Sequence, residues 1–325
     1  MRKRAADREP TAETLRAATA RIIGMRETDR ARFGVAVSGG PDSMALLVLA
    51  AEAFTGRVFA ATVDHQLRAA SADEARLVAR ACATLGVPHL ILTPDQPITG
   101  SVQAAARAAR YALLEQWRRD SGIDWVMTAH HADDQLETLA MRLNRASGLS
   151  GLAGIRERQG HVLRPLLGVR RGALHALVAA RAMPVVDDPS NRDPRFDRAR
   201  MRAALADSDL IDPVAVAESA RHLAQEEESL AWVTVQLAAD RLVLADAQCS
   251  VDMGHLPPAL RRRLLIAALA RMGEAEPRAE TLDRAIAEVL TGNAAMVGNS
   301  IIAQDAAVWT IRPAPPRRGS PDRSD

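Results

Sequence analysis

The feature that most constrains the fold is a glycine turn between two apolar runs near the start of the chain. An apolar run at residues 34–37 precedes the segment Ser38-Gly39-Gly40-Pro41-Asp42-Ser43, and a second run at 44–49 follows it. This order predicts a buried strand, a tight turn and then a helix. Glycines let backbone N–H groups approach an oxyanion, and the first turn of a helix adds unpaired N–H donors. The segment therefore predicts a phosphate site, with a ligand-free structural turn as the alternative.

The segment matches neither of two common nucleotide-binding motifs. The segment lacks the Gly-x-x-x-x-Gly-Lys-Ser/Thr pattern of P-loop NTPases, and it lacks the spaced glycines of dinucleotide-binding proteins. Lys3 is the only lysine of the chain. Phosphate recognition is therefore expected from arginines and backbone amides.

Strand and helix patterns alternate as far as residue 145. Further strands are predicted at 57–63, 89–92 and 124–129, and helices at 71–85, 102–117 and 133–145. This alternation predicts an α/β fold in which crossover helices connect the strands of a parallel sheet. Ligands of such sheets bind beyond the carboxyl ends of the strands. The polar segments 38–43, 64–68 and 130–137 all fall at those ends.

The remainder of the chain predicts a smaller, mainly helical C-terminal domain. A loop-rich stretch at 148–160 and a short helix at 174–181 come first, followed by turn residues at 187–191. Helices are then expected at 214–224, 226–244, 260–272 and 279–290, with two short strands within 295–311. The Pro-, Arg- and Ser-rich residues 313–325 predict a disordered tail.

Composition predicts a soluble cytoplasmic protein. The N-terminus has no signal-like apolar stretch, and no apolar run is long enough to span a membrane. Cys82 and Cys249 are the only cysteines and lie far apart in sequence, which argues against zinc and iron–sulfur sites.

Charge is distributed unevenly along the chain. Residues 156–202 hold 11 arginines against 5 acidic residues, whereas residues 203–325 hold 12 against 18. This contrast is typical of a localised site for a polyanion, but a solvated arginine-rich surface explains it equally well.

A second polar segment, residues 130–137, begins at a predicted strand end and enters a helix. Asp134 and Glu137 lie three residues apart, so their carboxylates share one helical face. Acidic residues also stabilise the positive end of a helix, which is a purely structural explanation. The HExxH spacing of zinc enzymes is absent. Magnesium is expected instead, held mainly by phosphates, with Asp42 as a ligand or as a helix cap.

These motifs together resemble the tRNA(Ile)-lysidine synthases of the PP-loop ATP pyrophosphatase superfamily. The resemblance rests on SGGPDS, VDHQLR (63–68), ARAARY (106–111), HHADDQLET (130–138), SGLSGL (147–152), RPLL (164–167) and DDPSN (187–191), together with Arg198 and Arg202. Two positions depart from the family pattern. Ala146 stands where glycine is common, and Ala199 stands where asparagine is common.

The resemblance implies four regions. Residues 1–30 form an N-terminal helical extension, 31–206 the PP-loop ATP-binding catalytic domain, 207–312 a mainly helical accessory domain for tRNA, and 313–325 the tail. It also implies a two-step ligation. ATP activates the C2 oxygen of the wobble cytidine in the CAU anticodon, releasing pyrophosphate, and the amine of free lysine then displaces AMP at C2.

The family motifs assign roles to individual residues. ATP contacts are expected from Ser38, Gly39, Gly40, Pro41, Asp42, Ser43, His65 and His130, and Mg²⁺ is expected on Asp42. The catalytic residues are expected to be Asp42, Arg107, Arg110, Asp134 and Glu137. The lysine substrate is expected at Asp134, Glu137 and Asp188, and the tRNA backbone at Arg192, Arg195, Arg198, Arg200 and Arg202.

Other functions stay open at this point. A tRNA thiolase of the same superfamily normally needs paired cysteines, and an amidotransferase-type synthetase normally carries a glutaminase unit. A nucleotide-binding module without catalysis gains nothing from the clustered carboxylates at Asp134 and Glu137. The formation of a homodimer is left open.

Overall fold

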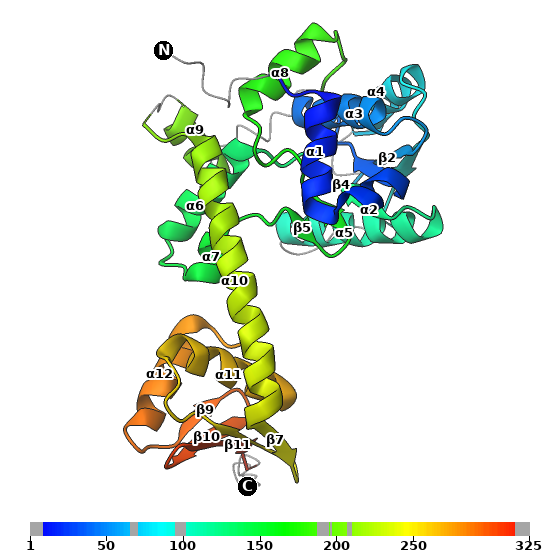
Figure 1. Ribbon diagram of the computed structural model, residues 1–325. Helices are drawn as coiled ribbons and strands as arrows, with labels where there is room; N and C mark the ends of the chain where they lie inside the picture. Colours follow the sequence, from blue (N-terminus) through cyan, green and yellow to red (C-terminus); the bar gives the residue numbers. More distant parts are fainter. Residues whose placement is uncertain are drawn as a thin grey trace, which may run out of the picture. The chain divides into compact units, whose positions relative to one another are not determined.

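The chain folds into two compact units, which are described separately. The computed structural model describes residues 9–65, 71–94, 102–186, 195, 197–206 and 210–315. One unit comprises residues 1–225 and the other comprises residues 226–325 (Figure 1). Helix α10 (Pro213–Arg241) begins in the first unit and ends in the second.

The first unit alternates helices and strands as the sequence predicts. Its helices are α1 (Ala12–Ile23), α2 (Met25–Arg30), α3 (Pro41–Ala53), α4 (Ser71–Thr84), α5 (Val102–Asp120), α6 (Ala132–Leu143), α7 (Leu149–Leu152), α8 (Arg171–Ala180) and α9 (Asp197–Ala206). Its strands are β1 (Phe33–Ala36), β2 (Val58–Val63), β3 (His89–Leu92), β4 (Trp125–Met127), β5 (Arg158–Gln159) and β6 (Val162–Leu163).

The six strands form one sheet in the order β3-β2-β1-β4-β6-β5. All neighbouring pairs are parallel except β5 and β6, which form a short antiparallel hairpin in the stretch predicted to be loop. The predicted parallel sheet is confirmed. Because β1, β2, β4 and β6 run the same way, the segments that follow them meet at one edge of the sheet.

Helices cover both faces of this sheet. The largest core cluster joins β1 to α3, and it includes Leu15 of α1, Val78 of α4 and Leu174 of α8. A smaller cluster packs α5 on the other face through Trp117. Gly34 allows this approach, because a Cβ there would lie 2.6 Å from the Trp117 ring. The helices α1 and α2 are thus part of the first unit, whereas the sequence placed residues 1–30 in an extension.

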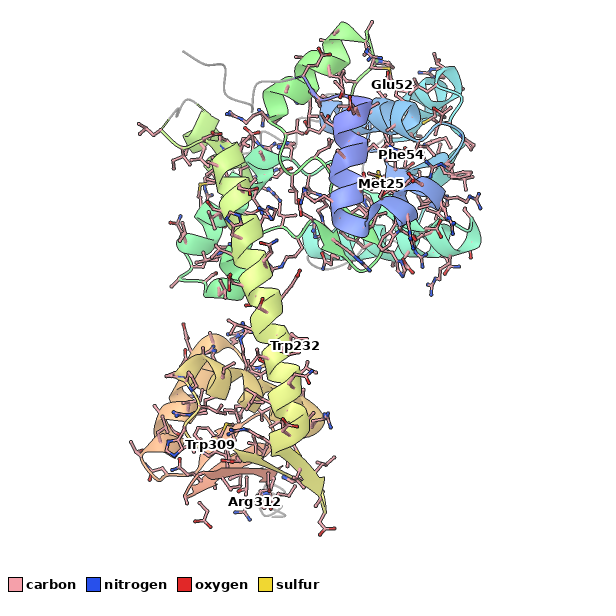
Figure 2. All side chains as sticks on the ribbon, in the orientation of Figure 1. Met25, Glu52, Phe54, Trp232, Trp309 and Arg312 are labelled. Atoms are coloured by element: carbon pink, nitrogen blue, oxygen red, sulfur yellow. The ribbon has the colours of Figure 1, made fainter. Side chains whose placement is uncertain are left out.

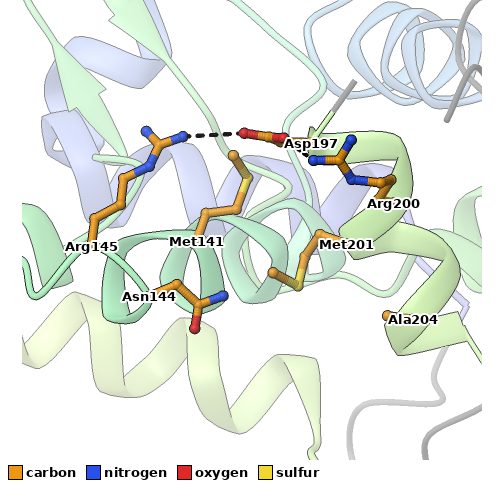
Figure 3. A pocket seen from close by; sticks show the side chains of 7 residues that line it. All are labelled: Met141, Asn144, Arg145, Asp197, Arg200, Met201 and Ala204. Atoms are coloured by element: carbon orange, nitrogen blue, oxygen red, sulfur yellow. Dashed lines mark hydrogen bonds and ion pairs between the residues drawn. The ribbon is translucent and has the colours of Figure 1, made fainter. Parts of the chain in front are cut away.

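Helix α9 packs beside α6, and a cleft of about 380 Å³ lies between them (Figure 3). Met141 of α6 and Met201 of α9 both line it. This pairing places the arginine-rich segment around residue 200 next to the acidic helix α6.

The second unit contains helices and an antiparallel sheet. Its helices are α11 (Pro258–Arg271) and α12 (Ala279–Leu290), together with the end of α10, and its strands are β7 (Leu242–Ala245), β8 (Gln248–Asp252), β9 (Ala295–Val297), β10 (Ser300–Asp305) and β11 (Val308–Pro313). The strand order is β7-β8-β11-β10-β9. Trp309 is 2% exposed and lies in the core of this unit (Figure 2).

Three details of this part differ from the sequence predictions. The helices expected at 214–224 and 226–244 are one continuous helix, α10, which ends at Arg241. The sheet has five strands where two were expected, and Pro313 belongs to β11. The units divide after residue 225, inside α10, whereas the sequence placed the boundary at 206/207. Of the predicted tail, residues 316–325 lie outside the described residues.

None of the helices in the described ranges has the length and apolar content needed to cross a membrane.

Candidate functional site

The glycine loop (residues 38–43) connects β1 to α3 at the carboxyl edge of the sheet. Gly39 has a φ of +86°, which favours glycine, and Pro41 occupies the first turn of α3. Inside the loop, the Ser38 N–H donates to Ser43 Oγ at 3.1 Å, and Ser43 Oγ donates to the Gly40 carbonyl at 2.9 Å. These bonds fix a short turn ahead of the free N–H groups of the helix.

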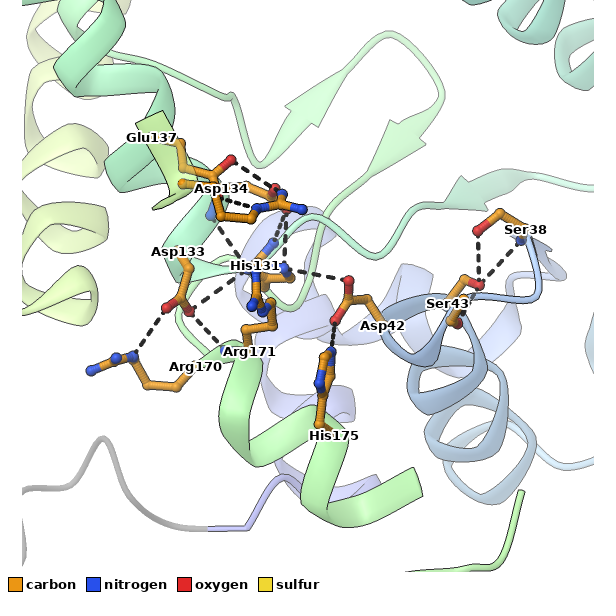
Figure 4. Close-up of polar contacts among 12 residues, drawn as sticks. Ser38, Asp42, Ser43, His131, Asp133, Asp134, Glu137, Arg170, Arg171 and His175 are labelled. Atoms are coloured by element: carbon orange, nitrogen blue, oxygen red, sulfur yellow. Dashed lines mark hydrogen bonds and ion pairs between the residues drawn. The ribbon is translucent and has the colours of Figure 1, made fainter. Parts of the chain in front are cut away.

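Asp42, in the first turn of α3, lies between two imidazoles (Figure 4). Its Oδ1 is 3.1 Å from His175 Nε2, and its Oδ2 is 3.6 Å from His131 Nε2. Burial alone would raise the pKa of Asp42, but the hydrogen bonds and charges of both histidines outweigh it and hold the pKa well below its ordinary value. Asp42 is therefore a carboxylate at neutral pH.

His131 links this aspartate to helix α6. It is the N-cap of α6, where its Nδ1 accepts the Asp134 N–H at 3.3 Å while Asp134 Oδ2 accepts the His131 N–H at 3.1 Å. The Nε2 atom therefore carries a proton and faces Asp42 and, at 3.5 Å, Asp134. Burial lowers the pKa of His131, yet the bond to Asp42 and the charges of Asp134 and Asp133 raise it overall.

Asp133 joins the start of α6 to the start of α8. Its Oδ2 accepts the Arg171 backbone N–H at 2.7 Å, and its Oδ1 is 3.5 Å from Arg170 Nε. We call Asp42, His131, Asp133, Asp134 and His175 the histidine–carboxylate cluster. A pocket of about 260 Å³ opens beside it, lined by Asp133, Glu137, His175 and Arg202 among others.

Glu137 is bound by two arginines of α9. Its side chain is only 4% exposed; Arg202 Nε donates to Oε1 at 2.7 Å, and Arg198 Nε donates to Oε2 at 3.1 Å. Arg202 Nη2 adds a bond to Oε2 at 3.2 Å. Both oxygens of Glu137 are thus occupied, and the pair of arginines fixes α9 on α6.

A second group of basic residues gathers around His130 at the end of β4. Burial and the charges of Arg164, Arg110, Arg198 and Arg107 lower the pKa of His130 to about 2, so its imidazole is neutral. Its Nδ1 is 2.9 Å from Thr128 Oγ1. Among the described residues, neither Arg107 and Arg110 of α5 nor Arg164 forms an ion pair with a carboxylate. This concentration of unneutralised charge favours an anion.

Two atoms near these arginines lack a hydrogen-bond partner among the described residues. They are His65 Nδ1 and Nε of Arg164, a residue that is only 2% exposed. Burial, with the charge of Arg110, also lowers the pKa of His65. Buried polar atoms of this kind normally have partners, so both atoms are available to a ligand.

The sheet thus brings most of the predicted site together at one edge. The glycine loop, His65, His130, Arg107, Arg110 and Asp134 all come from segments that follow or flank the carboxyl ends of the strands. Arg195 and Arg200 are exposed, whereas Arg198 and Arg202 contact Glu137. Asp188 and Arg192 lie outside the described residues.

The sequence prediction did not include His131, His175 or Arg164. His131 is adjacent to the predicted His130, and its position before the helix was the available signal. His175 carries no local motif, because only the packing of α8 on α3 brings it to Asp42. Arg164 belongs to the RPLL motif, but its burial was not visible in the sequence.

Comparisons with known proteins agree with this fold. A family model described as a PP-loop domain matches residues 12–208. The tRNA(Ile)-lysidine synthase of Zymomonas mobilis is 41% identical over 297 residues, covering 88% of this chain and 90% of that protein. The tRNA(Ile)-lysidine synthase of Novosphingobium aromaticivorans is 40% identical over 294 residues, with the same coverage of 88% and 90%.

A solved structure supports the fold alone. The U34-tRNA thiolase NcsA of Methanococcus maripaludis, determined with its [4Fe-4S] cluster, superposes with a TM-score of 0.53 at 14% identity, covering 65% of this chain and 78% of that one. The parallel sheet, the glycine loop and the extent of the sequence matches lead to one assignment. This chain belongs to the tRNA(Ile)-lysidine synthase family.

Proposed function

We propose that this chain uses ATP to join free lysine to C2 of the wobble cytidine in a tRNA(Ile) with a CAU anticodon. The C2 oxygen attacks the α-phosphate, and the bond to pyrophosphate breaks. An amine of lysine then attacks C2, loses a proton, and the C2–O bond breaks to release AMP. The observation that carries the proposal is the position of the glycine loop, which is connected through Asp42 and His131 to the carboxylate of Asp134.

ATP is proposed to bind with its phosphates over the glycine loop. The N–H groups of the loop and of the first turn of α3 donate to the oxygens on which negative charge develops. Arg107 and Arg110 supply further positive charge, since guanidinium groups match phosphate oxygens in geometry. The neutral imidazole of His130 and the buried Nε of Arg164 offer additional contacts.

Magnesium is proposed to accompany ATP, with Asp42 as its protein ligand. Asp42 is ionised, and its Oδ2 makes only a 3.6 Å contact with His131, so lone pairs remain for a cation. One carboxylate suffices, because Mg²⁺ in such sites is held mostly by phosphates and water. Bound there, it would neutralise charge on the phosphates. Its removal by a chelator is expected to stop both steps.

Lysine is proposed to bind in the pocket beside the histidine–carboxylate cluster. Its ammonium offers only donors and therefore needs a carboxylate; Asp133 and Glu137 line the pocket, and Asp134 adds a third carboxylate from the same stretch of α6. A carboxylate in this position also accepts the proton that the amine loses before attack. Asp188 remains part of the proposal on the family motif. Glu137 is proposed to act by positioning Arg198 and Arg202, because both its oxygens are already bound.

The tRNA backbone is proposed to contact the arginines of α9 and Arg195, which lies two residues before that helix. Arg195 and Arg200 are exposed and can bind phosphate directly. Arg198 and Arg202 use Nε and Nη2 in their contacts with α6, and their Nη1 groups are proposed to bind phosphate. Arg192 remains a proposal from the sequence alone.

The thiolase alternative is disfavoured by the cysteines of the chain. Cys82 lies in α4 of the first unit and Cys249 in β8 of the second, and both are buried. Burial raises the pKa of Cys82 to about 12, so this thiol is a poor nucleophile and metal ligand.

The proposal is tested by incorporation of labelled lysine into tRNA transcripts in the presence of ATP and Mg²⁺. Incorporation is expected with tRNA(Ile) bearing the CAU anticodon and not with the methionine tRNA that shares it. Asp134→Asn is expected to raise the KM for lysine at least tenfold and to leave the KM for ATP within twofold. Absence of lysine incorporation into either tRNA, or consumption of ATP that does not depend on tRNA, would contradict the proposal.

A further inference from the structure

The cleft between α6 and α9 lies outside the histidine–carboxylate cluster, and of its lining residues the proposed function uses only Arg200. The thioethers of Met141 and Met201 and the amide of Asn144 line it (Figure 3). Its rim carries Arg145 and Arg200, both held by Asp197: Arg145 Nη2 is 3.5 Å from Asp197 Oδ2, and Arg200 donates to the other oxygen. The volume of about 380 Å³ is within the range of small-ligand sites.

The cleft continues the faces of α6 and α9 that form the site. Met141 is four residues after Glu137 on α6, and Met201 is three residues after Arg198 on α9. Residues at these spacings share a helical face, and one helical turn advances about 5.4 Å. The cleft therefore begins about one turn beyond the ion pairs of Glu137, a step that one nucleotide of an unstacked loop can span.

The chemistry of the lining matches a nucleobase with its phosphate. Single-stranded RNA is recognised by stacking of splayed bases and by hydrogen bonds to their edges. The lining contains no aromatic side chain among the described residues, and the flexible, polarizable thioethers provide apolar contact in its place. The Asn144 amide offers a donor and an acceptor to a base edge. Arg145 and Arg200 add the positive charge that a phosphate requires.

We propose that this cleft binds the anticodon-loop nucleotide adjacent to the reacting cytidine, with the base between Met141 and Met201 and its phosphate on Arg145 and Arg200. The inference rests on the proposed function, since it assumes that the cytidine lies at the histidine–carboxylate cluster. It assigns part of anticodon recognition to α6 and α9.

The test pairs cleft variants with an anticodon loop in which single nucleotides are made abasic. Binding of fluorescent anticodon stem-loops is measured without ATP or lysine, and lysine incorporation is measured separately on full tRNA. Asn144→Ala and Met141→Ala remove cleft contacts, and Met141→Leu retains apolar volume. The matched control is Leu143→Ala, on the same helix and 58% exposed but outside the cleft lining.

One abasic position next to the cytidine is expected to weaken binding to the wild type about tenfold, as loss of a stacked base does. Asn144→Ala and Met141→Ala should each weaken binding to the intact loop. When the loop is abasic at that one position, the two variants should bind it as weakly as the wild type does, because the contact they remove is already absent. Met141→Leu and Leu143→Ala should bind within about twofold of the wild type, a difference below 0.5 kcal/mol by the relation of 1.4 kcal/mol per tenfold.

Two results separate the inference from the proposed function. If the loss of binding caused by a cleft variant adds to the loss caused by an abasic nucleotide at every loop position, the cleft assignment is wrong. With lysine incorporation intact in the wild type, the proposed function would still stand. Absence of lysine incorporation in the wild type would overturn the proposed function, and with it the placement of the cytidine on which the cleft assignment depends.

Discussion

The substitution Glu137→Gln tests whether this buried carboxylate fixes α9 or binds lysine. Glutamine keeps the shape of the side chain but removes its charge and replaces one acceptor oxygen with an NH₂ donor. That donor then faces the guanidinium groups of Arg198 or Arg202. The expected result is a less stable first unit in which α9 is loosened from α6.

The structure sets the size of this effect. Breaking a fully buried ion pair costs about 3–5 kcal/mol, because a buried charge loses its partner. Glu137 is 4% exposed, but Arg198 and Arg202 are 43% and 30% exposed, so water solvates them when the pair is lost. We therefore expect a loss of about 2 kcal/mol in the free energy of unfolding. For a unit of 225 residues this corresponds to a fall in Tm of roughly 4–8 °C.

Calorimetry of the thermal unfolding of the wild type and of Glu137→Gln measures the change in Tm. Glu115→Gln is the matched control, since Glu115 bonds Arg118 through two N–H groups at 2.9 Å but is 40% exposed. The control is expected to change stability by less than about 1 kcal/mol. If Glu137→Gln unfolds within 1 °C of the wild type and raises only the KM for lysine, Glu137 is a lysine ligand and the anchoring role is wrong.

Three further substitutions follow from single features of the first unit. Gly39→Ala should lower the free energy of unfolding by about 2 kcal/mol and raise the KM for ATP, since the φ of Gly39 is +86° and a Cβ there would lie 2.8 Å from Val186 Cγ2. An unchanged KM for ATP would show that the loop does not bind ATP. Ala146→Gly should raise Tm slightly, by a gain of roughly 0.5–1 kcal/mol, because Ala146 has a φ of 49° that glycine adopts without strain; a fall in Tm would show that the loop is unstrained. His130 has its pKa lowered to about 2, so its neutral form stabilises the fold above pH 6.5 and that contribution declines as the pH falls below 6.5. Between pH 6.5 and 5.5 the wild type should thus lose about 1 kcal/mol more than His130→Gln; equal losses in urea titrations would refute a neutral, buried imidazole.

The sequence predicts those parts of the fold that depend on local pattern. The strand, glycine loop and helix at residues 33–53 form as expected, because the apolar runs and the glycines specify them within a short window. The strands β7 and β8 were missed. The apolar residues of β7 follow those of α10 directly, and Leu244 of β7 is exposed. The sequence therefore shows no change from a helical to a strand pattern at the point where α10 ends.

The site was predictable as a set of motifs but not as a set of contacts. Asp134 and Glu137 were placed on one face of a helix, which the structure bears out. Their different environments follow from Arg198 and Arg202, which are 61 and 65 residues from Glu137 in sequence. His175 is likewise 133 residues from Asp42. Contacts at such separations depend on how the helices pack, which no local spacing specifies.

The order of the two chemical steps is tested most directly with ATP labelled at its α-phosphate. The wild type is incubated with tRNA(Ile) bearing the CAU anticodon and Mg²⁺, first without lysine and then with it. The account predicts that the label becomes attached to the tRNA without lysine, and that added lysine releases it as AMP while lysine enters the tRNA. Label that never reaches the tRNA, or AMP that forms without tRNA, would contradict the proposed activation of the cytidine.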